Sequence, residues 1–382
     1  MDKYIFEIIV VGGGASGMMA AGRAGECGAK VILLEKGNRL GRKLLISGKG
    51  RCNLTNTGEL AEFLSHFGKT KDFLRNAFSR FFNQDLKEFF ENRGLKLKVE
   101  RGGRIFPETD RASSVVEILT DYLIENGVKI LFNSRVKEVL IKDKTVQGVK
   151  LYNGKVFSAK RVIVATGGKS YAWTGSSGDG YEIARELGHR VTKLSPALVP
   201  LITRENFVKE LQGLSLKNVR ASVMEGGKPI VSEFGEMLFT HFGLSGPIIL
   251  SLSGDIVDLL EEHKEIVISI DLKPALNKEQ LQERIIRDVK TMGRKIFKNY
   301  LKELLPVRLI PIVLRILMHP CEKKINQLSR LERERLIELL KNFRLTVIGT
   351  RSWEEAMVTR GGVSVKEINP QTMESKLIKG LF

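Results

Sequence analysis

The sequence predicts an α/β protein whose N-terminal half holds a mostly parallel sheet with helices on both faces. Strands alternate with helices up to about Pro196, which is the pattern of such a sheet. After Pro200 shorter strand-like runs take over, and helix formers then dominate from Lys278 to Phe343. The predicted domains are an α/β domain at 1–196 continued by 359–382, a β-rich insertion at 197–277 and 344–358, and a small basic helical subdomain at 278–343.

A glycine-rich turn follows the first predicted strand, Ile8 to Val11. Gly12, Gly14 and Gly17 have the spacing G-x-G-x-x-G, and a small, apolar helix runs from Met18 to Ala29. With this spacing the first glycine allows a tight turn, the second lets a pyrophosphate approach the backbone, and the third lets the helix pack on its strand. The helix N-terminus offers unpaired N–H groups to the phosphates. The turn therefore predicts a dinucleotide site in a Rossmann-like domain.

A second buried strand, Val31 to Leu34, ends at Glu35. An acid at this distance after the glycine turn is placed to accept hydrogen bonds from an adenosine ribose. The alternative is a glycine-rich turn in an unrelated α/β domain, and the combination of strand, helix and acid disfavours it.

The remaining elements follow the same patterns. Apolar periodicity predicts helices, and β-branched runs bounded by turn residues predict strands, with a hairpin signal at Asn153-Gly154. The predicted helices are Lys71 to Arg93 and Ala112 to Asn126, and the predicted strands are 129–132, 146–152, 155–157, 161–165, 221–224 and 265–270.

The chain is strongly basic. It has 62 Lys and Arg against 44 Asp and Glu, a formal net charge of +18. The segment from Lys278 to Arg344 holds 17 basic and 8 acidic residues, a net charge of +9 that is half of the total. This segment is either a nucleic-acid-binding face or a well-solvated helical surface.

Several classes are disfavoured by the sequence. The first strand begins too early for a signal peptide, and the apolar region Leu304 to Met318 is interrupted by two prolines and two arginines, so no transmembrane segment is predicted. Cys27, Cys52 and Cys321 have no disulfide or metal-ligand spacing. A cytoplasmic protein without a metal site or structural disulfide is expected.

The loop from Lys36 to Asn56 contains six basic residues and no acid, with glycines between them. Such a loop suits an anionic cofactor, because backbone amides and cationic side chains can donate to it. A flexible surface loop is the alternative.

This loop resembles the signature of the HI0933-like family of bacterial FAD-dependent oxidoreductases, above all in the stretch from Gly41 to Asn56. The resemblance spans essentially the whole chain. Its other motifs are Gly103 to Pro107, Ala165 to Ser170, Thr174 to Ser176, Gly178 to Gly180, Ser195 to Leu201, Phe239 to His241, Gly243 to Pro247, Val358 to Val363 and Thr372 to Lys376.

The resemblance implies a glutathione-reductase-like FAD domain interrupted by a β-barrel-like domain with a helical insert. It selects FAD among the dinucleotides. Because no second strand with G-x-G-x-x-G is found, NADH or NADPH is expected either to bind transiently as the reductant or not to be needed. The residues expected to bind FAD are Gly12, Gly14, Ala15, Ser16, Gly17, Glu35, Lys36, Gly41, Arg42, Lys43, Ser47, Gly48, Gly50, Arg51, Cys52, Asn53, Val136, Ala165, Thr166, Gly167, Gly168 and Asp179.

Lys49, Arg51 and His241 are the candidates for catalysis. Lys49 and Arg51, with Asn53, are placed to stabilise negative charge at the flavin pyrimidine, although Arg51 equally suits the pyrophosphate. His241 is the best titratable group for acid or base work, and a structural histidine is its alternative. Cys52 is expected to be a buried thiol, and Asp179 either a cofactor ligand or a helix cap.

Two departures from the family are visible. Ala172 and Ser177 stand where relatives usually have Pro and Thr. The family also continues beyond the position of Phe382 into a strand, a turn and a helix that meets the flavin, so the C-terminal flavin-binding segment is expected to be missing and flavin binding to be weakened.

The resemblance implies the NAD(P)H-linked reduction of a carbon–carbon double bond, with a uridine of ribosomal RNA as one candidate substrate. The basic segment from Lys278 to Arg344 would then be the face that binds the RNA phosphates. The alternatives are a small-molecule enzyme, either an amino-ketone oxidase or a reductase of bile-acid-type substrates, and a non-enzymatic flavoprotein or membrane-surface binder that uses Leu304 to Met318.

Overall fold

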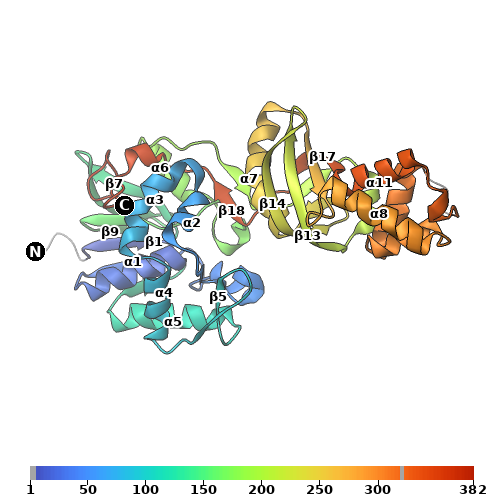
Figure 1. Cartoon of the computed structure of the whole chain (residues 1–382). Helices are drawn as coiled ribbons and strands as arrows, with labels where there is room; N and C mark the ends of the chain where they lie inside the picture. The colour runs from blue at the N-terminus through green and yellow to red at the C-terminus, as the bar shows by residue number, and fades with distance from the viewer. Residues whose placement is uncertain (1–5, 319–321) are drawn as a thin grey trace, which may run out of the picture. The chain divides into compact units, whose positions relative to one another are not determined.

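The computed structural model describes residues 6–318 and 322–382, and the chain divides into two compact units (Figure 1). Unit 1 comprises Met1–Leu194 with Gly361–Phe382, and unit 2 comprises Ser195–Arg360. Cys321 lies outside the described residues. No helix of the described ranges is long and apolar enough to cross a membrane.

Unit 1 is built on a four-stranded parallel sheet. Short apolar runs form its strands, because residues buried on both faces need no polar alternation. The strand order is β10-β1-β2-β6, and Ile9 lies between Val162 and Ile32 in the register. The C-terminal residues run parallel to β10, since Val162 donates to Gly380 and Phe382 donates to Val162. The strands are β1 (Ile8–Val11), β2 (Val31–Leu34), β6 (Lys129–Leu131) and β10 (Arg161–Val164).

The two faces of this sheet are covered differently. Val10, Val31 and Leu33 pack against α1 (Ala15–Glu26) and α5 (Ala112–Glu125). The opposite face packs mainly against a three-stranded antiparallel sheet, with Ile183 of α6 (Asp179–Glu186) contributing. The expected parallel sheet is confirmed, but the expectation of helices on both faces is met on one face only. The covering strands are β7 (Val136–Lys142), β8 (Thr145–Leu151) and β9 (Val156–Ser158).

Short turns explain this second sheet. Asp143 and Lys144 both have positive φ, as a two-residue hairpin turn between twisted strands requires, and they join β7 to β8. The hairpin predicted at Asn153-Gly154 is confirmed, because Gly154 has a φ of +84° in the turn between β8 and β9. Strand β7 was missed because Asp143-Lys144 is an unusual sequence for such a turn.

The segment between residues 55 and 107 completes unit 1. Its helix predicted from Lys71 to Arg93 is divided, because Phe81 and Phe82 have extended backbone and the Asp85 side chain accepts from the Phe82 N–H. Strands β3, β5 and β4 form a small antiparallel sheet. The elements are β3 (Thr55–Asn56), α2 (Leu60–Ser65), α3 (Lys71–Arg80), α4 (Asn83–Glu91), β4 (Leu97–Val99) and β5 (Arg104–Pro107).

Unit 2 contains a closed six-stranded barrel in the order β12-β15-β14-β13-β16-β17, which confirms the expected barrel-like insertion. Helix α7 (Pro247–Glu262) packs on β14, and β11 (Ser195–Ala197) pairs with β18 (Val358–Arg360). The barrel strands are β12 (Leu201–Thr203), β13 (Ser215–Glu225), β14 (Lys228–Phe239), β15 (Gly243–Ser245), β16 (Ile266–Asp271) and β17 (Phe343–Thr350).

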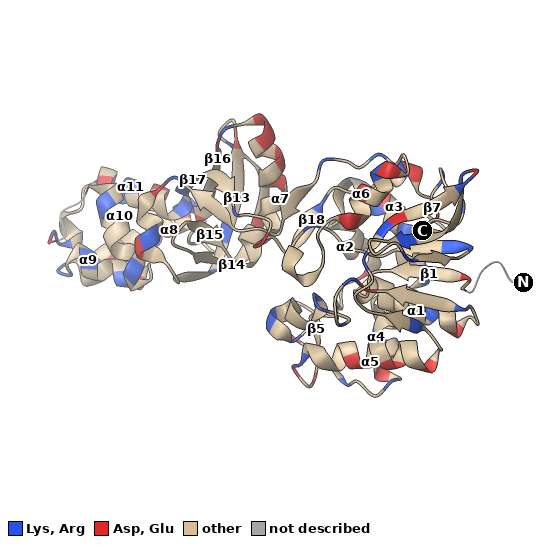
Figure 2. Ribbon diagram, turned by 180° about the vertical axis from the view of Figure 1, so that it is seen from behind, with Lys and Arg blue, Asp and Glu red and all other residues tan. Residues whose placement is uncertain are grey.

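The helices between β16 and β17 have no separate core. Leu281, Ile285 and Leu336 pack in one cluster with barrel residues such as Ile268 and Phe343. Lys and Arg residues recur along these helices (Figure 2). The helices are α8 (Lys278–Met292), α9 (Phe297–Tyr300), α10 (Ile310–Leu317) and α11 (Arg330–Lys341).

The apolar region Leu304 to Met318 belongs to this shared core. Leu309, Ile310 and Val313 are among its buried members. Val307, Ile316 and Met318 of the same region are exposed, so the membrane-binding alternative for this region stays a prediction.

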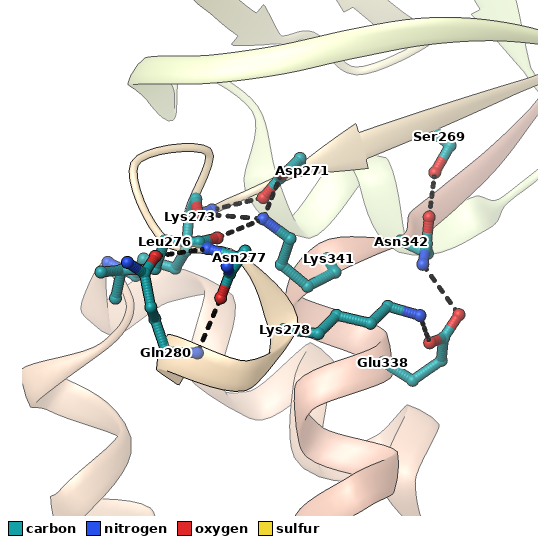
Figure 3. A network of polar contacts seen from close by, with 10 residues as sticks. All are labelled: Ser269, Asp271, Lys273, Leu276, Asn277, Lys278, Gln280, Glu338, Lys341 and Asn342. Carbon is teal, nitrogen blue, oxygen red and sulfur yellow. Dashed lines mark hydrogen bonds and ion pairs between the residues drawn. The ribbon is translucent and has the colours of Figure 1, made fainter. Parts of the chain in front are cut away.

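A polar network joins the helical insert to the barrel (Figure 3). The ammonium of Lys341 lies 2.6 Å from the carboxylate of Asp271 and donates to the carbonyls of Leu276 (2.6 Å) and Lys273 (3.2 Å). Its side chain is only 13% exposed. A largely buried cation is stabilised when such acceptors surround it, so Lys341 ties the end of α11 to the loop that leads into α8.

We expect Lys341→Met to destabilise unit 2 by about 2–4 kcal/mol, because Asp271 loses its cation and two carbonyls lose a donor. Lys278→Met is the matched control: its ion pair with Glu338 is half exposed, so its loss should cost less than about 1 kcal/mol. Urea unfolding measures both. Equal stability of the Lys341→Met and wild-type proteins would contradict the assignment.

Candidate functional site

The turn between β1 and α1 is sterically closed at two of its glycines. A Cβ on Gly17 would lie 1.9 Å from the carbonyl oxygen of Gly12, and a Cβ on Gly12 would lie 2.6 Å from that of Ala165. Gly12 also has a φ of +106°, which favours glycine. These two glycines are therefore required by the contact of α1 with β1 and β10.

Gly14 differs from both of them. A Cβ at Gly14 would have no protein atom within 4 Å, and its φ is −82°. Ala15 and Ser16, the first residues of α1, are exposed, and the first turn of α1 contains no acid. An open backbone in front of an uncapped helix N-terminus fits a pyrophosphate, which binds to such N–H groups. Gly14, Ala15 and Ser16 thus present an open backbone suited to a pyrophosphate, while Gly12 and Gly17 hold the turn against the helix.

Glu35 follows β2 and reaches back to this turn. Its carboxylate accepts hydrogen bonds from the backbone N–H of Gly13 (2.7 Å) and of Gly37 (2.6 Å), one on each oxygen. Each carboxylate oxygen has a second lone pair. The side chain is therefore fixed beside the glycine turn and can still accept from the two hydroxyls of a ribose.

The basic loop after Glu35 is fastened to the segment 170–179. Lys43 donates to the carbonyl of Ser170 (2.8 Å), and Arg42 donates to that of Trp173 (2.7 Å). Burial lowers the pKa of Lys43. Gly41 has a φ of +65° and faces Val116, which leaves no room for a side chain. Lys43 and Arg42 were expected as cofactor donors, and here they position the loop.

Lys36 and Asp179 meet across 143 residues of sequence. Asp179 accepts from Lys36 (3.1 Å), from Ser177 (2.6 Å) and from Arg135 (3.1 and 3.3 Å), and Lys36 also donates to Ser177. Burial raises the pKa of Asp179, but these donors outweigh it and the net shift is downward. Asp179 makes no helix-capping hydrogen bond, because Gly178 is the N-cap residue.

Sequence reasoning missed Arg135 and Ser177 in this cluster. The departure from the family at Ser177 was the one signal that marked either of them. Val136, an expected FAD contact, lines a pocket of about 210 Å³ together with Asp179, Tyr152 and Glu182. The structure thus brings Val136 and Asp179 together.

Residues 47–53 wind through unusual backbone conformations. Gly48, Lys49, Gly50 and Cys52 all have positive φ. Such conformations at Lys49 and Cys52 cost free energy and persist only where the surroundings hold them. Cys52 donates its backbone N–H to the Ser47 carbonyl, and its side chain is 1% exposed. Burial raises the pKa of this thiol, although a hydrogen bond with Ser47 opposes the shift, so Cys52 is a buried neutral thiol.

The two cations of this stretch differ in their surroundings. Arg51 donates to Glu100 (2.6 Å) and Asp110 (3.3 Å) and lies over the ring of Phe106. The hydrogen bond with Glu100 raises the pKa of Arg51. Lys49 is exposed and makes no hydrogen bond or ion pair within residues 6–318 and 322–382. Lys49 therefore retains a free charge for a ligand, whereas the charge of Arg51 is compensated by two acids.

The loop after β10 lies beside the glycine turn. Ala165 donates to the Val11 carbonyl, and a Cβ on Gly167 would lie 2.8 Å from the Ser176 hydroxyl. Thr166 packs against Gly180, because a Cβ added to Gly180 would lie 2.2 Å from the Thr166 hydroxyl. The stretch Ala165 to Gly168 is thus held between β1 and α6, next to Gly12.

His241 belongs to unit 2. It lies in the turn between β14 and β15, which Gly243 fixes through the Thr240 hydroxyl and a close approach to the Leu201 carbonyl. The imidazole is exposed and contacts the ring of Phe242, and within the described part of the chain it makes no hydrogen bond.

A buried histidine elsewhere was not anticipated. His189 lies 2.9 Å from a Glu367 carboxylate oxygen and 2.8 Å from the Ser375 hydroxyl. Ser375 also accepts from the N–H groups of Leu377 and Ile378. Because both lone pairs of the Ser375 oxygen are used, the Ser375 hydroxyl donates to Nε2 of His189. The imidazole therefore carries its proton on Nδ1, the nitrogen that faces Glu367. This network fixes the C-terminal segment of unit 1.

Comparison with known proteins identifies relatives over the whole chain. The family model described as "HI0933-like protein Rossmann domain" matches residues 6–382. The 3-dehydro-bile acid delta(4,6)-reductase of Clostridium scindens is 33% identical over 98% of this chain and 91% of its own length. The ribosomal RNA dihydrouridine synthases of Haemophilus influenzae and Escherichia coli are 32% and 30% identical, with 92% and 90% of their lengths covered.

Solved structures show the same fold at lower identity. The 3-ketosteroid delta1-dehydrogenase of Sterolibacterium denitrificans, in complex with 1,4-androstadiene-3,17-dione, superposes with a TM-score of 0.50 at 13% identity. The match covers 99% of this chain and 92% of that one.

We expect Gly14→Ala and Gly17→Ala to behave oppositely. Gly14→Ala should fold normally, because its backbone and surroundings accept a methyl group, but bind FAD at least roughly tenfold more weakly because the methyl occupies the phosphate space. Gly17→Ala should lose about 1–3 kcal/mol of stability through its clash with Gly12. Thermal unfolding and fluorescence titration with FAD measure the two effects. Unchanged FAD affinity in Gly14→Ala would argue against this site.

The lowered pKa of Asp179 predicts a specific pH dependence. A carboxyl group whose folded pKa lies below its ordinary value of 3.8 stabilises the fold above that pH, and the contribution is lost as the pH falls through the folded pKa. Wild type should therefore be more stable than Asp179→Asn at neutral pH, and the difference should shrink below pH 3.8. Urea unfolding at several pH values tests this, and a difference independent of pH would contradict it.

Proposed function

This chain belongs to the HI0933-like family of flavin-dependent oxidoreductases, and from that premise we propose that it reduces a carbon–carbon double bond conjugated to a carbonyl group, using NADH or NADPH and FAD. One observation supports this most strongly. Relatives named for two very different substrates match more than nine-tenths of the chain at nearly equal identity. A uracil ring that becomes dihydrouracil and a 3-oxo steroid with unsaturation at carbon 4 share that conjugated double bond. The reaction class is therefore better supported than either substrate.

The residues described above would hold the cofactor in two parts. The Gly12–Gly17 turn and the N-terminus of α1 would bind the pyrophosphate, and Glu35 would accept from the ribose hydroxyls. When bound, FAD supplies the hydride chemistry, while the protein orients the reactants and adjusts the charge around them.

The reaction also needs a proton donor and a positive charge beside the reacting groups. Addition of a hydride to one carbon of the double bond requires a proton at the other carbon. His241 would supply that proton, since its imidazole is exposed on a rigid turn and has no hydrogen-bonding partner within the described residues. Lys49 would stabilise negative charge, because it is exposed and has no partner among the described residues, whereas Arg51 would position that loop through Glu100 and Asp110.

Anaerobic reduction tests the proposal. The purified full-length chain with FAD should lose its oxidised-flavin absorbance on addition of NADH or NADPH. A 4-ene-3-oxo steroid or protein-free ribosomal RNA should then restore it, with the product identified by mass spectrometry. His241→Gln should slow the restoration by about 10²-fold or more while leaving reduction by the nicotinamide largely intact.

Two outcomes would contradict the proposal. If neither nicotinamide reduces the flavin, the chain is not an NAD(P)H-linked reductase. If an amine or amino-ketone reduces it and oxygen then yields peroxide, the chain is an oxidase.

A further inference from the structure

Many cations of the helical insert are neutralised by acids of unit 2. Ion pairs bring a carboxylate within 4 Å of each, so their charge is compensated locally. These pairs are Lys278 with Glu338, Lys295 with Glu303, Lys323 with Glu332, Arg330 with Glu334, Lys341 with Asp271, and Arg315 with Glu210.

Several other cations of the insert have no such partner among the described residues, and five of these lie close together between residues 287 and 302. They follow one another along the chain from the C-terminal half of α8 to the turn after α9, and all are exposed. None makes a side-chain hydrogen bond or ion pair in the described part of the chain. We call them the basic row: Arg287, Lys290, Arg294, Lys298 and Lys302.

The basic row is held on a rigid support. Arg287 and Lys290 lie on one face of α8 because they are three residues apart, and Arg294 follows four residues later. The next helix is fixed to α8 by the hydrogen bond from Tyr300 to Asp288 (2.9 Å), and Phe297, Tyr300 and Leu301 are fully buried. Asp288 is the one acid between residues 287 and 302. It is half-buried and accepts a hydrogen bond from Tyr300, so it does not neutralise the cations of the basic row.

Stabilisation of the α8 C-terminus explains only part of this arrangement. Cations near the end of a helix interact favourably with its dipole, typically by about 0.3–1 kcal/mol, which accounts for Lys290 and Arg294. Lys298 and Lys302 lie beyond that turn, and each leaves an exposed charge that no acid compensates. Removal of such charges from the surface is not expected to unfold the insert.

We propose that the basic row binds the phosphate backbone of an RNA substrate. A row of uncompensated lysines and arginines about 10 Å long on α8 suits a polyanion with closely spaced charges. Most apolar side chains of α9 and α10 are buried, but Ile316 of α10 is 42% exposed, so the test below includes vesicles of anionic lipid. The inference rests on the proposed function, since it selects RNA over a small unsaturated ketone as the substrate class.

The test compares two triple variants of equal charge. R287Q/K290Q/R294Q removes part of the basic row, and K278Q/K295Q/R330Q removes three cations that have acid partners. Gln is nearly as good a helix former as Lys and Arg, and thermal unfolding checks that both variants fold. The probe is protein-free ribosomal RNA, whose affinity is measured as a function of salt between about 50 and 200 mM.

We expect the basic-row variant to bind RNA at least roughly tenfold more weakly than wild type. The slope of log affinity against log salt concentration should become shallower by about 2, because each lost phosphate contact removes about 0.7–0.9 from this slope. The control should stay within about threefold of wild type. K298Q/K302Q, which leaves α8 unchanged, should show a smaller loss in the same direction.

Equal losses in the two triple variants would overturn the proposal, because net charge alone would then account for binding. So would a wild-type protein that does not bind the RNA at low salt, or variants that lose affinity only for vesicles of anionic lipid. The proposed reductase activity fails separately, when NADH and NADPH do not reduce the flavin. A chain that reduces a steroid enone and ignores RNA retains the proposed function and loses this inference.

Discussion

The closeness of α1 to β1 is the constraint on which unit 1 depends. A Cβ on Gly17 would nearly coincide with the Gly12 carbonyl, so the helix lies directly on the strand that precedes it. The same approach places Gly13 where its N–H meets Glu35 and its carbonyl accepts from Gly41. One packing contact thus brings together a helix N-terminus, an acid from β2 and the start of the basic loop. The open face of Gly14 is the consequence that matters for ligand binding.

The basic loop shows how a local charge pattern acquires a different use in the folded chain. Lys36, Arg42 and Lys43 reach the segment 170–179 and fasten it beside the glycine turn. The protein itself already uses these donors, so the side chains are held in one conformation. Such side chains lose little entropy when a ligand binds beside them. Lys49, with its positive φ and free ammonium, is the contrasting case.

Local signals of the sequence were sufficient where the governing interaction is local. The glycine spacing, the buried runs of β1 and β2 and the Asn153-Gly154 turn each depend on neighbours within a few residues, and each appears as predicted. The partners of Arg51 and Lys36 could not be read in this way, since Glu100 and Asp179 lie 49 and 143 residues away. A run of cations without a nearby acid indicates an anion, but whether that anion is a ligand or a distant carboxylate is decided by tertiary structure.

The same distinction separates the two kinds of cation in the helical insert. Lys341 is largely buried at the junction with the barrel, where removal of one partner leaves an uncompensated charge, so its role is structural. The residues of the basic row are exposed on helices whose apolar faces share the core of the barrel. Because that common core fixes the helices, the exposed charges keep a constant spacing without any ion pairs among themselves. A surface of this kind costs the fold little and remains available to a polyanion, which is why the uncompensated charges carry more functional information than the net charge of the segment.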